Sequence, residues 1–423
     1  MGFACLSIGP VSSLPERSDP AHDTGAGAVG YDDGEGLVGP PLGGFRSGER
    51  GGGNESCLKF VESEVSIPIS EIKAFIKRTA AEAGFDLAGI APAADSPELE
   101  RFPQWIADGH AGEMKYMAAR DERGELKRAS LARVAPWAQS VIVCAVNYNT
   151  DHPYSTECRE GERGWISRYA WTREDYHDAV LGRLKRVEAL LGEAFADANE
   201  PVVTRSYVDT GPIVERVFAK YAGVGWIGKN TCIINQKGGS WLFLGVILAS
   251  LKLEPDLPAP DRCGTCARCI EACPTDAIVA PYQLDSNRCI AYLTIEKRGA
   301  VAEDLRADIG RHVFGCDICQ DVCPWNRKAP ASSWPEFAAR DELVNPVLDW
   351  LAEISPEEFR RAFGGSALLR TKRAGIRRNA VIAMGNSGRQ EFLPVLKQLA
   401  SDEDRVVAEA AAWAVTRLKS YPR

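Results

Sequence analysis

The residues best suited to chemistry are four cysteines in the short segment CGTCARCIEACP, which ends at Pro274. They are Cys263, Cys266, Cys269 and Cys273, and together they occupy only eleven positions. This spacing, CxxCxxCxxxCP, is typical of bacterial ferredoxins with two 4Fe–4S clusters, in which the fourth cysteine binds the other cluster. The segment therefore predicts iron–sulfur chemistry and requires four more cysteine ligands elsewhere in the chain.

Cysteines further along the chain can supply those ligands. The segment CDICQDVCP contains three of them, and Cys289 is the remaining one, 27 residues before Cys316 instead of three. That displacement departs from the simple ferredoxin pattern. The predicted ligands are Cys263, Cys266, Cys269 and Cys323 for one cluster, and Cys273, Cys289, Cys316 and Cys319 for the other.

Two zinc sites are the alternative, because four cysteines also suit zinc. Zinc sites usually separate two CxxC pairs widely, whereas here four cysteines share one short loop, so the spacing favours iron–sulfur clusters. Two such clusters carry electrons at potentials commonly near about −400 mV, which predicts that the chain performs a reduction. The other cysteines share no ligand spacing and are interpreted as ordinary core or surface residues; they are Cys5, Cys57, Cys144, Cys158 and Cys232.

Composition indicates a globular chain of two or three domains. Of its 423 residues, 45% are hydrophobic and 26% are charged. The longest apolar run, WLFLGVILASL, has eleven residues and is too short to span a bilayer. The beginning of the chain lacks the pattern of an export signal, so we expect a cytoplasmic protein with reduced thiols and no membrane partner.

The pattern along the chain predicts an α+β multidomain protein. Residues 1–64 contain 14 of the 39 glycines without periodicity and are expected to be a disordered extension. A mixed α/β domain is expected at 65–255, a ferredoxin-like two-cluster module at 256–335, and HEAT-like helical repeats at 336–423.

Within the α/β domain, a helix is expected from Ser70, with Ile72 and Ile76 on one face and a stop at Gly84. Strands are expected at 140–148, 202–209 and 230–235, and helices at 174–196 and 211–222.

The site that receives the electrons is less evident from the residues. No GxGxxG segment follows an expected strand, so a Rossmann dinucleotide site is not supported. Asp209, in the segment VDTGP, lies between an expected strand and the helix expected to start at Gly211 and Pro212. A carboxylate there can face a site or can cap the helix, and the residues alone do not decide between the two.

Several segments in their order resemble one known family, the epoxyqueuosine reductases. These segments are ISRYAWTREDYHDAV, YVDTGPIVERVFAKYAGVGWIGKNT, WLFLGVIL, both cysteine motifs and RNAVIAMGNSG. The resemblance covers residues 65–420. It implies a cobalamin-binding catalytic domain, two 4Fe–4S clusters and HEAT-like helices, and reduction of epoxyqueuosine to queuosine at the wobble position of tRNA.

The resemblance also implies roles for particular residues. Asp209 matches the family's catalytic acid, and removing an epoxide oxygen as water requires two electrons and two protons. To hold a proton near neutral pH, Asp209 would need a raised pKa, which we expect from desolvation under the corrin. Residues expected to contact cobalamin are Tyr176, His177, Asp209, Lys229 and Asn230.

A DxHxxG motif, which would supply a histidine to cobalt, is incomplete because Val180 replaces its glycine. Cobalamin is therefore expected to be base-off. His177 is otherwise an ordinary histidine on a helix face, and the residues leave that alternative open.

The C-terminal region is basic within an acidic chain. Residues 356–423 contain 13 Lys or Arg and 7 Asp or Glu, a net charge of +6, while the whole chain carries −8. A charge run is usually a solvated face, but here it suggests contact with RNA phosphates. The expected RNA contacts are Lys297, Arg298, Arg373, Arg377 and Arg378.

The expected partners are a tRNA with a queuosine-type anticodon and an external low-potential electron donor, and the chain is expected to be a monomer. Two alternatives remain. One is a reductive dehalogenase-like corrinoid enzyme acting on a small molecule, and the other is an electron-transfer protein without catalysis.

Overall fold

The computed structural model describes residues 69–196 and 201–421. The extension expected at 1–64 lies outside the described residues. The description that follows concerns the described part of the chain alone.

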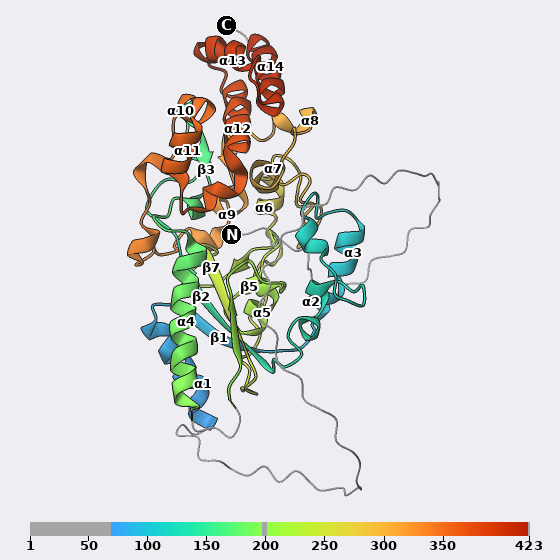
Figure 1. Cartoon of the computed structure of the whole chain (residues 1–423), viewed down its shortest axis with the longest axis vertical. Helices are drawn as coiled ribbons and strands as arrows, with labels where there is room; N and C mark the ends of the chain where they lie inside the picture. Colours follow the sequence, from blue (N-terminus) through green and yellow to red (C-terminus); the bar gives the residue numbers. More distant parts are fainter. Residues whose placement is uncertain (1–68, 197–200, 422–423) are drawn as a thin grey trace, which may run out of the picture. The chain divides into compact units, whose positions relative to one another are not determined.

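A four-stranded antiparallel sheet forms the centre of the N-terminal domain (Figure 1). Its order is β1 (Leu87–Pro92), β2 (Ser140–Asn147), β7 (Leu242–Ala249) and β4 (Thr204–Tyr207). All eight residues of β2 are buried, because β2 lies inside the sheet and helices cover both faces. A strand covered on both faces is apolar throughout, which is why SVIVCAVN lacks the alternation of a half-exposed strand.

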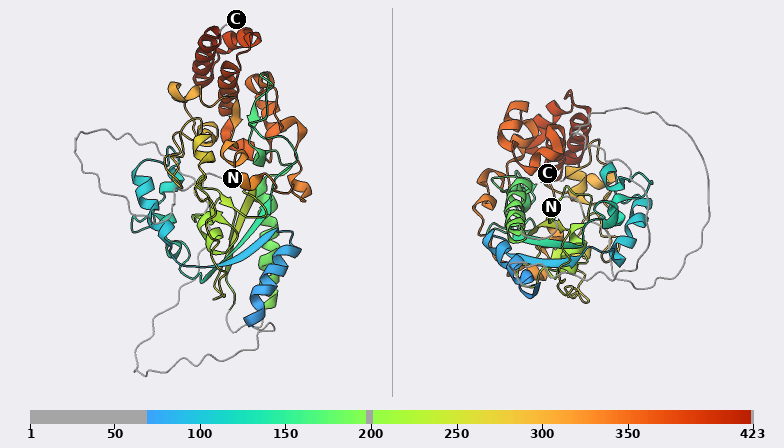
Figure 2. Two further views of the ribbon diagram at one scale, coloured as in Figure 1. Left: turned by 180° about the vertical axis from the view of Figure 1, so that it is seen from behind. Right: turned by 60° about the horizontal axis from the view of Figure 1, so that its bottom comes forward.

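Helices α1 (Ile69–Glu82) and α4 (Tyr176–Ala194) cover one face of the sheet, and α5 (Glu215–Tyr221) covers the other (Figures 1 and 2). Glycines allow the close approach. A Cβ at Gly245 of β7 would lie 2.7 Å from Leu184 of α4, and one at Gly89 of β1 would lie 1.9 Å from the carbonyl oxygen of Ala222, directly after α5. Helix α4 and the C-terminal end of α5 therefore pack directly against the backbone of the strands.

Most of the expected elements are present, with shifted bounds. The first helix buries Ile72 and Ile76 as expected, but it begins at Ile69, so Ser70 lies inside its first turn. The helix expected at 211–222 begins only at Glu215, because residues 208–214 form a turn in place of a helix start. The strand expected at 230–235 is a two-residue strand, β6 (Ile233–Ile234), paired with β5 (Trp226–Ile227). The apolar run from Trp241 is the interior strand β7.

The cysteine region is built from short helices. The two cysteine loops contain α6 (Arg268–Glu271) and α9 (Ile318–Asp321), which pack together, and α7 (Ile290–Ile295) begins directly after Cys289. Here α8 (Glu303–Arg306) precedes β8 (His312–Phe314), which pairs in parallel with β3 (Trp165–Ile166). That pairing attaches the cysteine region to the N-terminal domain.

The C-terminal region is helical, as expected. It contains α10 (Leu348–Glu353), α11 (Pro356–Phe363), α12 (Lys372–Asn386), α13 (Leu393–Leu399) and α14 (Arg405–Lys419). Helix α12 lies at its centre and packs on α10, α14, α7 and β8. Eleven consecutive residues of α12, 375–385, are buried, so this helix belongs to the core on nearly every side.

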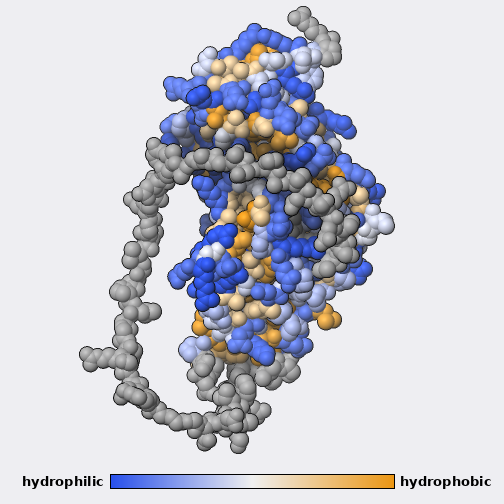
Figure 3. Space-filling model, turned by 90° about the vertical axis from the view of Figure 1, so that its right-hand side faces the viewer, coloured by the Kyte–Doolittle hydropathy of each residue, from blue (hydrophilic) through white to orange (hydrophobic). Residues whose placement is uncertain are grey.

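Hydrophilic residues are interspersed with small apolar patches on the face shown in Figure 3. Among the residues that the structure describes, no helix combines the length and the apolar character needed to span a bilayer.

The close approach at Gly89 generates a stability prediction. Gly89→Ala should lower the denaturant midpoint of unfolding, by a free energy of about 1–3 kcal/mol, because the new methyl group meets backbone that cannot rotate away. Gly182→Ala in α4 is the matched control, since a Cβ there meets no atom within 4 Å and alanine favours the helix. Equal stability of the two variants would contradict the packing described here.

Candidate active site

Asp209 lies in the turn between β4 and α5, with a backbone φ of +59°. Aspartate is one of the few residues other than glycine that tolerates this left-handed conformation. The backbone N–H of Asp209 donates a 2.6 Å hydrogen bond to Oε1 of Glu215, the first residue of α5. Glu215 is 7% exposed, so a buried carboxyl group fixes the turn that presents Asp209.

The start of α4 supplies two partners for the Asp209 carboxylate. The Tyr176 hydroxyl donates a 2.8 Å hydrogen bond to Asp209 Oδ2, and His177 Nε2 lies 3.7 Å from the same oxygen. The other imidazole nitrogen, Nδ1, lies 2.6 Å from Oδ1 of Asp175, which also caps the helix by accepting from the His177 N–H. Both ring nitrogens of His177 thus face carboxylates.

These contacts lower the pKa of Asp209. Burial alone would raise it, but the hydrogen bond and positive charge of His177, together with the Tyr176 hydroxyl, hold the pKa of this carboxyl below its ordinary value. Burial disfavours the charged imidazole, yet Asp175 and Asp209 raise the pKa of His177 to about 9. In this arrangement the proton lies on His177, and the raised pKa that we expect for Asp209 beneath a corrin stays a prediction.

Glu215 behaves in the opposite way. Burial, and then the negative charge of Asp209, raise the pKa of Glu215 to about 8. Near neutral pH the site therefore holds one proton on His177 and one on Glu215, on either side of an ionised Asp209.

Asp209 faces a cavity of about 770 Å³, within the size range of small-molecule and cofactor sites. Tyr176 and His177 line the same wall as Asp209. Residues from the cysteine region and from the C-terminal region line other parts of it, including Glu296, Arg298, Arg370 and Lys372. The cavity is therefore built by three parts of the chain.

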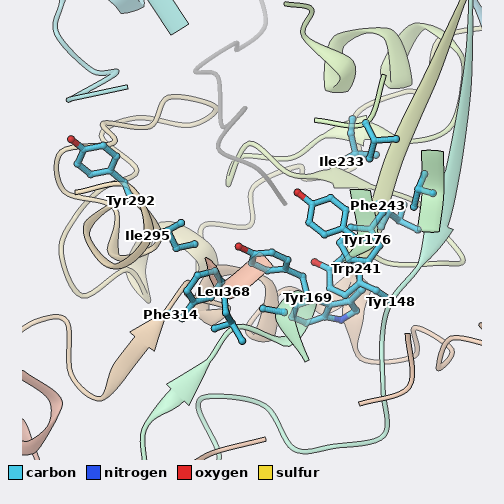
Figure 4. Packing of buried hydrophobic residues seen from close by; sticks show 14 of the residues in the cluster. Tyr148, Tyr169, Tyr176, Ile233, Trp241, Phe243, Tyr292, Ile295, Phe314 and Leu368 are labelled. Atoms are coloured by element: carbon cyan, nitrogen blue, oxygen red, sulfur yellow. The ribbon is translucent and has the colours of Figure 1, made fainter. Parts of the chain in front are cut away.

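Aromatic packing holds Tyr176 in place (Figure 4). Its ring lies parallel to Phe243 of β7, with 4.3 Å between the centroids, and Phe243 packs on Tyr148. On its other side Tyr176 meets Tyr169 edge to face, and Tyr169 packs on Phe314 of β8. Since the rings of Tyr169 and Tyr176 are both buried, the Tyr176 hydroxyl that binds Asp209 has a fixed position.

The structure places the predicted cluster cysteines in two neighbouring regions, and the assignment of ligands to each cluster stays a prediction. In the first group, Cys323 packs beside Cys263. Burial, followed by the charges of neighbouring thiolates that include Cys263 and Cys266, raises the pKa of Cys269 to about 12 and of Cys323 to about 11. Such crowding of thiols suits a centre of positive charge.

The second group, Cys273, Cys289, Cys316 and Cys319, lines one cavity together with Cys232. Burial, and then the charges of Cys289 and Cys273, raise the pKa of Cys316 well above its ordinary value. Tyr169 and Ile295 line both this cavity and the Asp209 cavity. The second cysteine group and the Asp209 site are thus separated by the thickness of a shared wall.

Lys229 and Asn230, expected near cobalamin, lie instead against the cysteine loops. The Lys229 ammonium donates to the carbonyl oxygens of Gly264 and Cys266, at 2.7 and 3.0 Å, and the Asn230 amide donates to the carbonyl of Cys319. Neither lines the Asp209 cavity. The GKN turn thus lies at the cysteine module, and contact of both residues with cobalamin stays a prediction.

Most of the basic residues expected to contact RNA do not face the Asp209 cavity. Arg378 is fully buried and donates to the carbonyl oxygens of Leu293, Lys297 and Gly299, and burial lowers its pKa to about 10. Arg377 is 5% exposed and pairs with Asp402. These two assignments are wrong, because each guanidinium satisfies internal acceptors.

Arg373 donates to the carbonyl of Ile354, and Lys297 pairs with Glu113 outside the cavity. Of the five expected RNA contacts, Arg298 alone lines the Asp209 cavity.

Sequence reasoning missed several residues of the site. Glu215 carries a weak signal, since it follows Asp209 by six residues in the same motif. Tyr169 could not be distinguished from other core aromatics. Arg370 belongs to the basic run at 370–378, but its partner Glu296, 74 residues away, is brought to it only by the fold.

Comparison with known proteins agrees with this geometry. Residues 128–210 match a family described as epoxyqueuosine reductase QueG, residues 262–326 a 4Fe–4S double cluster binding domain, and residues 348–423 HEAT repeats. An epoxyqueuosine reductase of Xanthomonas campestris is 38% identical over 82% of this chain and 96% of its own length. One from Synechocystis is 43% identical over 69% of this chain and 98% of its own.

The chain belongs to the epoxyqueuosine reductase family. A solved epoxyqueuosine reductase, bound to an epoxyqueuosine-modified tRNA-Tyr stem loop, superposes with a TM-score of 0.73 at 31% identity, covering 83% of this chain and 91% of the other. These matches confirm the predicted fold class: a mixed α/β domain, a two-cluster 4Fe–4S domain and HEAT repeats.

Cys289 offers a test of the displaced ligand. Cys289→Ser in this epoxyqueuosine reductase homologue should lower the iron content of anaerobically prepared protein from about eight to about four per chain, because only the second cluster loses a ligand. Cys158→Ser, at a half-buried cysteine outside both groups, should keep all eight. Iron and sulfide analysis measures both, and a Cys289→Ser protein with a full complement would refute the assignment.

The pKa of His177 provides a second test. A histidine with a raised pKa stabilises the fold fully below about pH 6.5, and that contribution disappears as the pH rises through about 9. In an NMR titration of the cobalamin-free chain, Asp209→Asn should shift the pKa of His177 downward. Asp178→Asn, which removes another carboxylate of the same cavity, should leave it near its starting value. Equal values in all three proteins would exclude the ion pair.

Proposed function

We propose that this chain reduces epoxyqueuosine to queuosine in tRNA, with Asp209 at the reacting centre. The observation that carries the proposal is the shared wall of Tyr169 and Ile295, with the cavity of the second cysteine group on one side and the Asp209 cavity on the other. A reduction needs an electron source beside a proton source, and this arrangement provides both. The described relatives, which are epoxyqueuosine reductases, support the same substrate.

The electron path runs from the first cysteine group to the second. Cys263, Cys266, Cys269 and Cys323 hold the cluster that receives electrons, and the loop around it exposes residues 261, 262, 264, 265 and 268. An external low-potential donor docks at this loop. Cys273, Cys289, Cys316 and Cys319 hold the second cluster, next to the shared wall.

Cobalamin is the proposed cofactor of the Asp209 cavity, and when bound it would supply the reducing chemistry of the reaction. The residues present fit a base-off form: His177 has both ring nitrogens directed to carboxylates and so offers no free nitrogen to a metal. Tyr176, His177 and Asp209 line the cavity that would hold it.

The proton supply follows from the contacts of Asp209. The reaction consumes two protons, and the site stores two near neutral pH, on His177 and Glu215. Asp209 accepts a proton from His177 and passes it to the departing oxygen, and Tyr176 orients the carboxylate during the transfer. In a solved Bacillus subtilis epoxyqueuosine reductase a catalytic aspartate loop is swung out of the active site, and Asp209 here also lies in a short turn, which Glu215 fixes.

The proposed partner is a tRNA whose modified base enters the cavity past Arg298. We keep the expectation of a monomer in the cytoplasm, where tRNA is modified.

Asp209→Asn tests the proton role. Asparagine also tolerates a positive φ and can still accept from Tyr176, so folding and both clusters should be retained. Turnover of an epoxyqueuosine-containing stem loop should fall by about 10²-fold or more, the scale for a positioned acid. Single-turnover conversion, followed by nucleoside mass spectrometry, measures it.

The control is Asp178→Asn, which changes the charge of the same cavity without touching Asp209 and should convert at a near-normal rate. If Asp209→Asn also converts normally, the proton reaches the substrate by another route.

A further inference from the structure

The rim of the Asp209 cavity contains an unusual group of exposed side chains, from residues far apart in the chain. Among the described residues, six large apolar side chains are exposed, and two of them, Tyr116 at 38% and Leu369 at 42%, line this one cavity. Arg370 and Lys372 lie beside Leu369 on the same rim. Exposed apolar groups next to basic ones mark a binding surface for a ligand that has both flat apolar parts and negative charge.

Arg370 is immobilised although half of it is exposed. Its Nε and Nη2 donate to the two carboxylate oxygens of Glu296, at 2.8 and 3.1 Å, and its guanidinium carbon lies 5.5 Å from the centroid of the Tyr116 ring. Its side chain is nevertheless 51% exposed. Glu296 is 9% exposed and belongs to the segment whose carbonyls Arg378 holds, so the anchor itself is rigid.

This geometry decides which part of Arg370 can meet a ligand. The edge formed by Nε and Nη2 is occupied by Glu296, which also offsets the positive charge. The half-exposed guanidinium can still offer a flat face to a ligand. Flat guanidinium and aromatic surfaces are the groups on which proteins stack unpaired RNA bases.

Lys372 has a different feature, a strained backbone. Its φ of +62° and ψ of +163° lie in a region that is essentially restricted to glycine. The side chain lines the same rim and is exposed. Strain of this kind persists where function requires the side chain, and an exposed lysine at an RNA site contacts a phosphate.

We propose that Arg370, backed by Tyr116 and flanked by Leu369, is a stacking platform for the nucleotide next to the modified base, and that Lys372 binds the phosphate of that nucleotide. This inference rests on the proposed function and deepens it, because it assigns how the anticodon loop is held while one base occupies the cavity. The platform separates the neighbouring base from the modified one, which leaves the modified base free to enter.

The test is a double-mutant cycle in which a substitution at Arg370 is combined with removal of one RNA base, and the affinity of the stem loop is measured. The protein used is the full chain with its clusters. Three epoxyqueuosine stem loops are needed: one intact, one abasic at the 5′ neighbour of the modified nucleotide, and one abasic at the 3′ neighbour. With the intact loop, Arg370→Ala should weaken binding by roughly 5- to 100-fold, the scale of one stacked base. With one of the two abasic loops, the same substitution should weaken binding by less than about twofold, because the base that it stacks on is missing.

Two further variants separate stacking from charge. Arg370→Lys keeps the positive charge but loses the flat face, so it should bind the intact loop nearly as weakly as Arg370→Ala. Arg389→Ala is the matched control, because Arg389 is another exposed arginine of the C-terminal region and pairs with Glu162 outside the cavity. This variant should bind all three loops with the affinity of the unaltered chain.

The variant Lys372→Gly tests whether the Lys372 side chain binds RNA or has only a structural role. It should raise Tm, because glycine relieves the backbone strain, and at the same time weaken binding equally to all three loops. The slope of log Kd against log salt should become shallower by about 0.7. A lower Tm, or unchanged affinity, would overturn the role of Lys372.

The stacking proposal is overturned if Arg370→Ala costs the same affinity with all three loops, or if Arg370→Lys binds like the unaltered chain. Conversion of the intact loop by the unaltered chain tests the proposed function separately. If the unaltered chain converts the loop but the effect of Arg370→Ala does not depend on the neighbouring base, only the stacking proposal is wrong. If that effect depends on the neighbouring base but no loop is converted, only the proposed reaction is wrong.

Discussion

One buried carboxylate, Asp317, connects the cysteine chemistry to the catalytic domain. It lies between Cys316 and Cys319, is 1% exposed, and accepts hydrogen bonds from the Trp165 indole, the Ser167 hydroxyl and the Arg168 backbone N–H at 2.5–2.9 Å. A buried carboxylate is tolerated only when its oxygens are satisfied, so the 165–168 segment and the second cysteine loop cannot separate without a large cost. Tyr169 follows this segment directly, and its place in the shared wall depends on the same contact.

The Asp209 site shows how the balance of burial and hydrogen bonding decides protonation. Two carboxyl groups of one turn, the half-buried Asp209 and the buried Glu215, have pKa values that move in opposite directions. Asp209 faces an imidazolium and a phenol, whereas Glu215 accepts from a backbone N–H and lies beside the negative charge of Asp209. The low pKa of Asp209 describes the site without cofactor or substrate, and it makes His177 the group that stores the proton.

The parts of the structure that the sequence predicted well are those governed by local spacing. Cysteine ligands follow spacing rules along the chain, β2 is a short continuous apolar run, and the buried residues of α4 recur with the helical period, so these could be recognised in advance. Arg377 and Arg378 could not, because a basic run looks the same whether it faces water or internal carbonyls. The Asp209 turn was misjudged for a related reason: Gly211 and Pro212 favour a helix start, but the buried Glu215 delays the helix to pair with the Asp209 N–H.

The burial of Arg378 limits how the helical repeat region can be exchanged between proteins. A helical repeat domain at a chain end is commonly regarded as a transplantable unit that could be exchanged without affecting the rest. Here α12 carries Arg378 and Asn379, which bind the carbonyls of residues 293, 294, 297, 299 and 313, and Cys289 lies directly before the helix that precedes this loop. The repeat region is therefore part of the redox scaffold, and a chimera that replaced it would have to rebuild the metal centre as well.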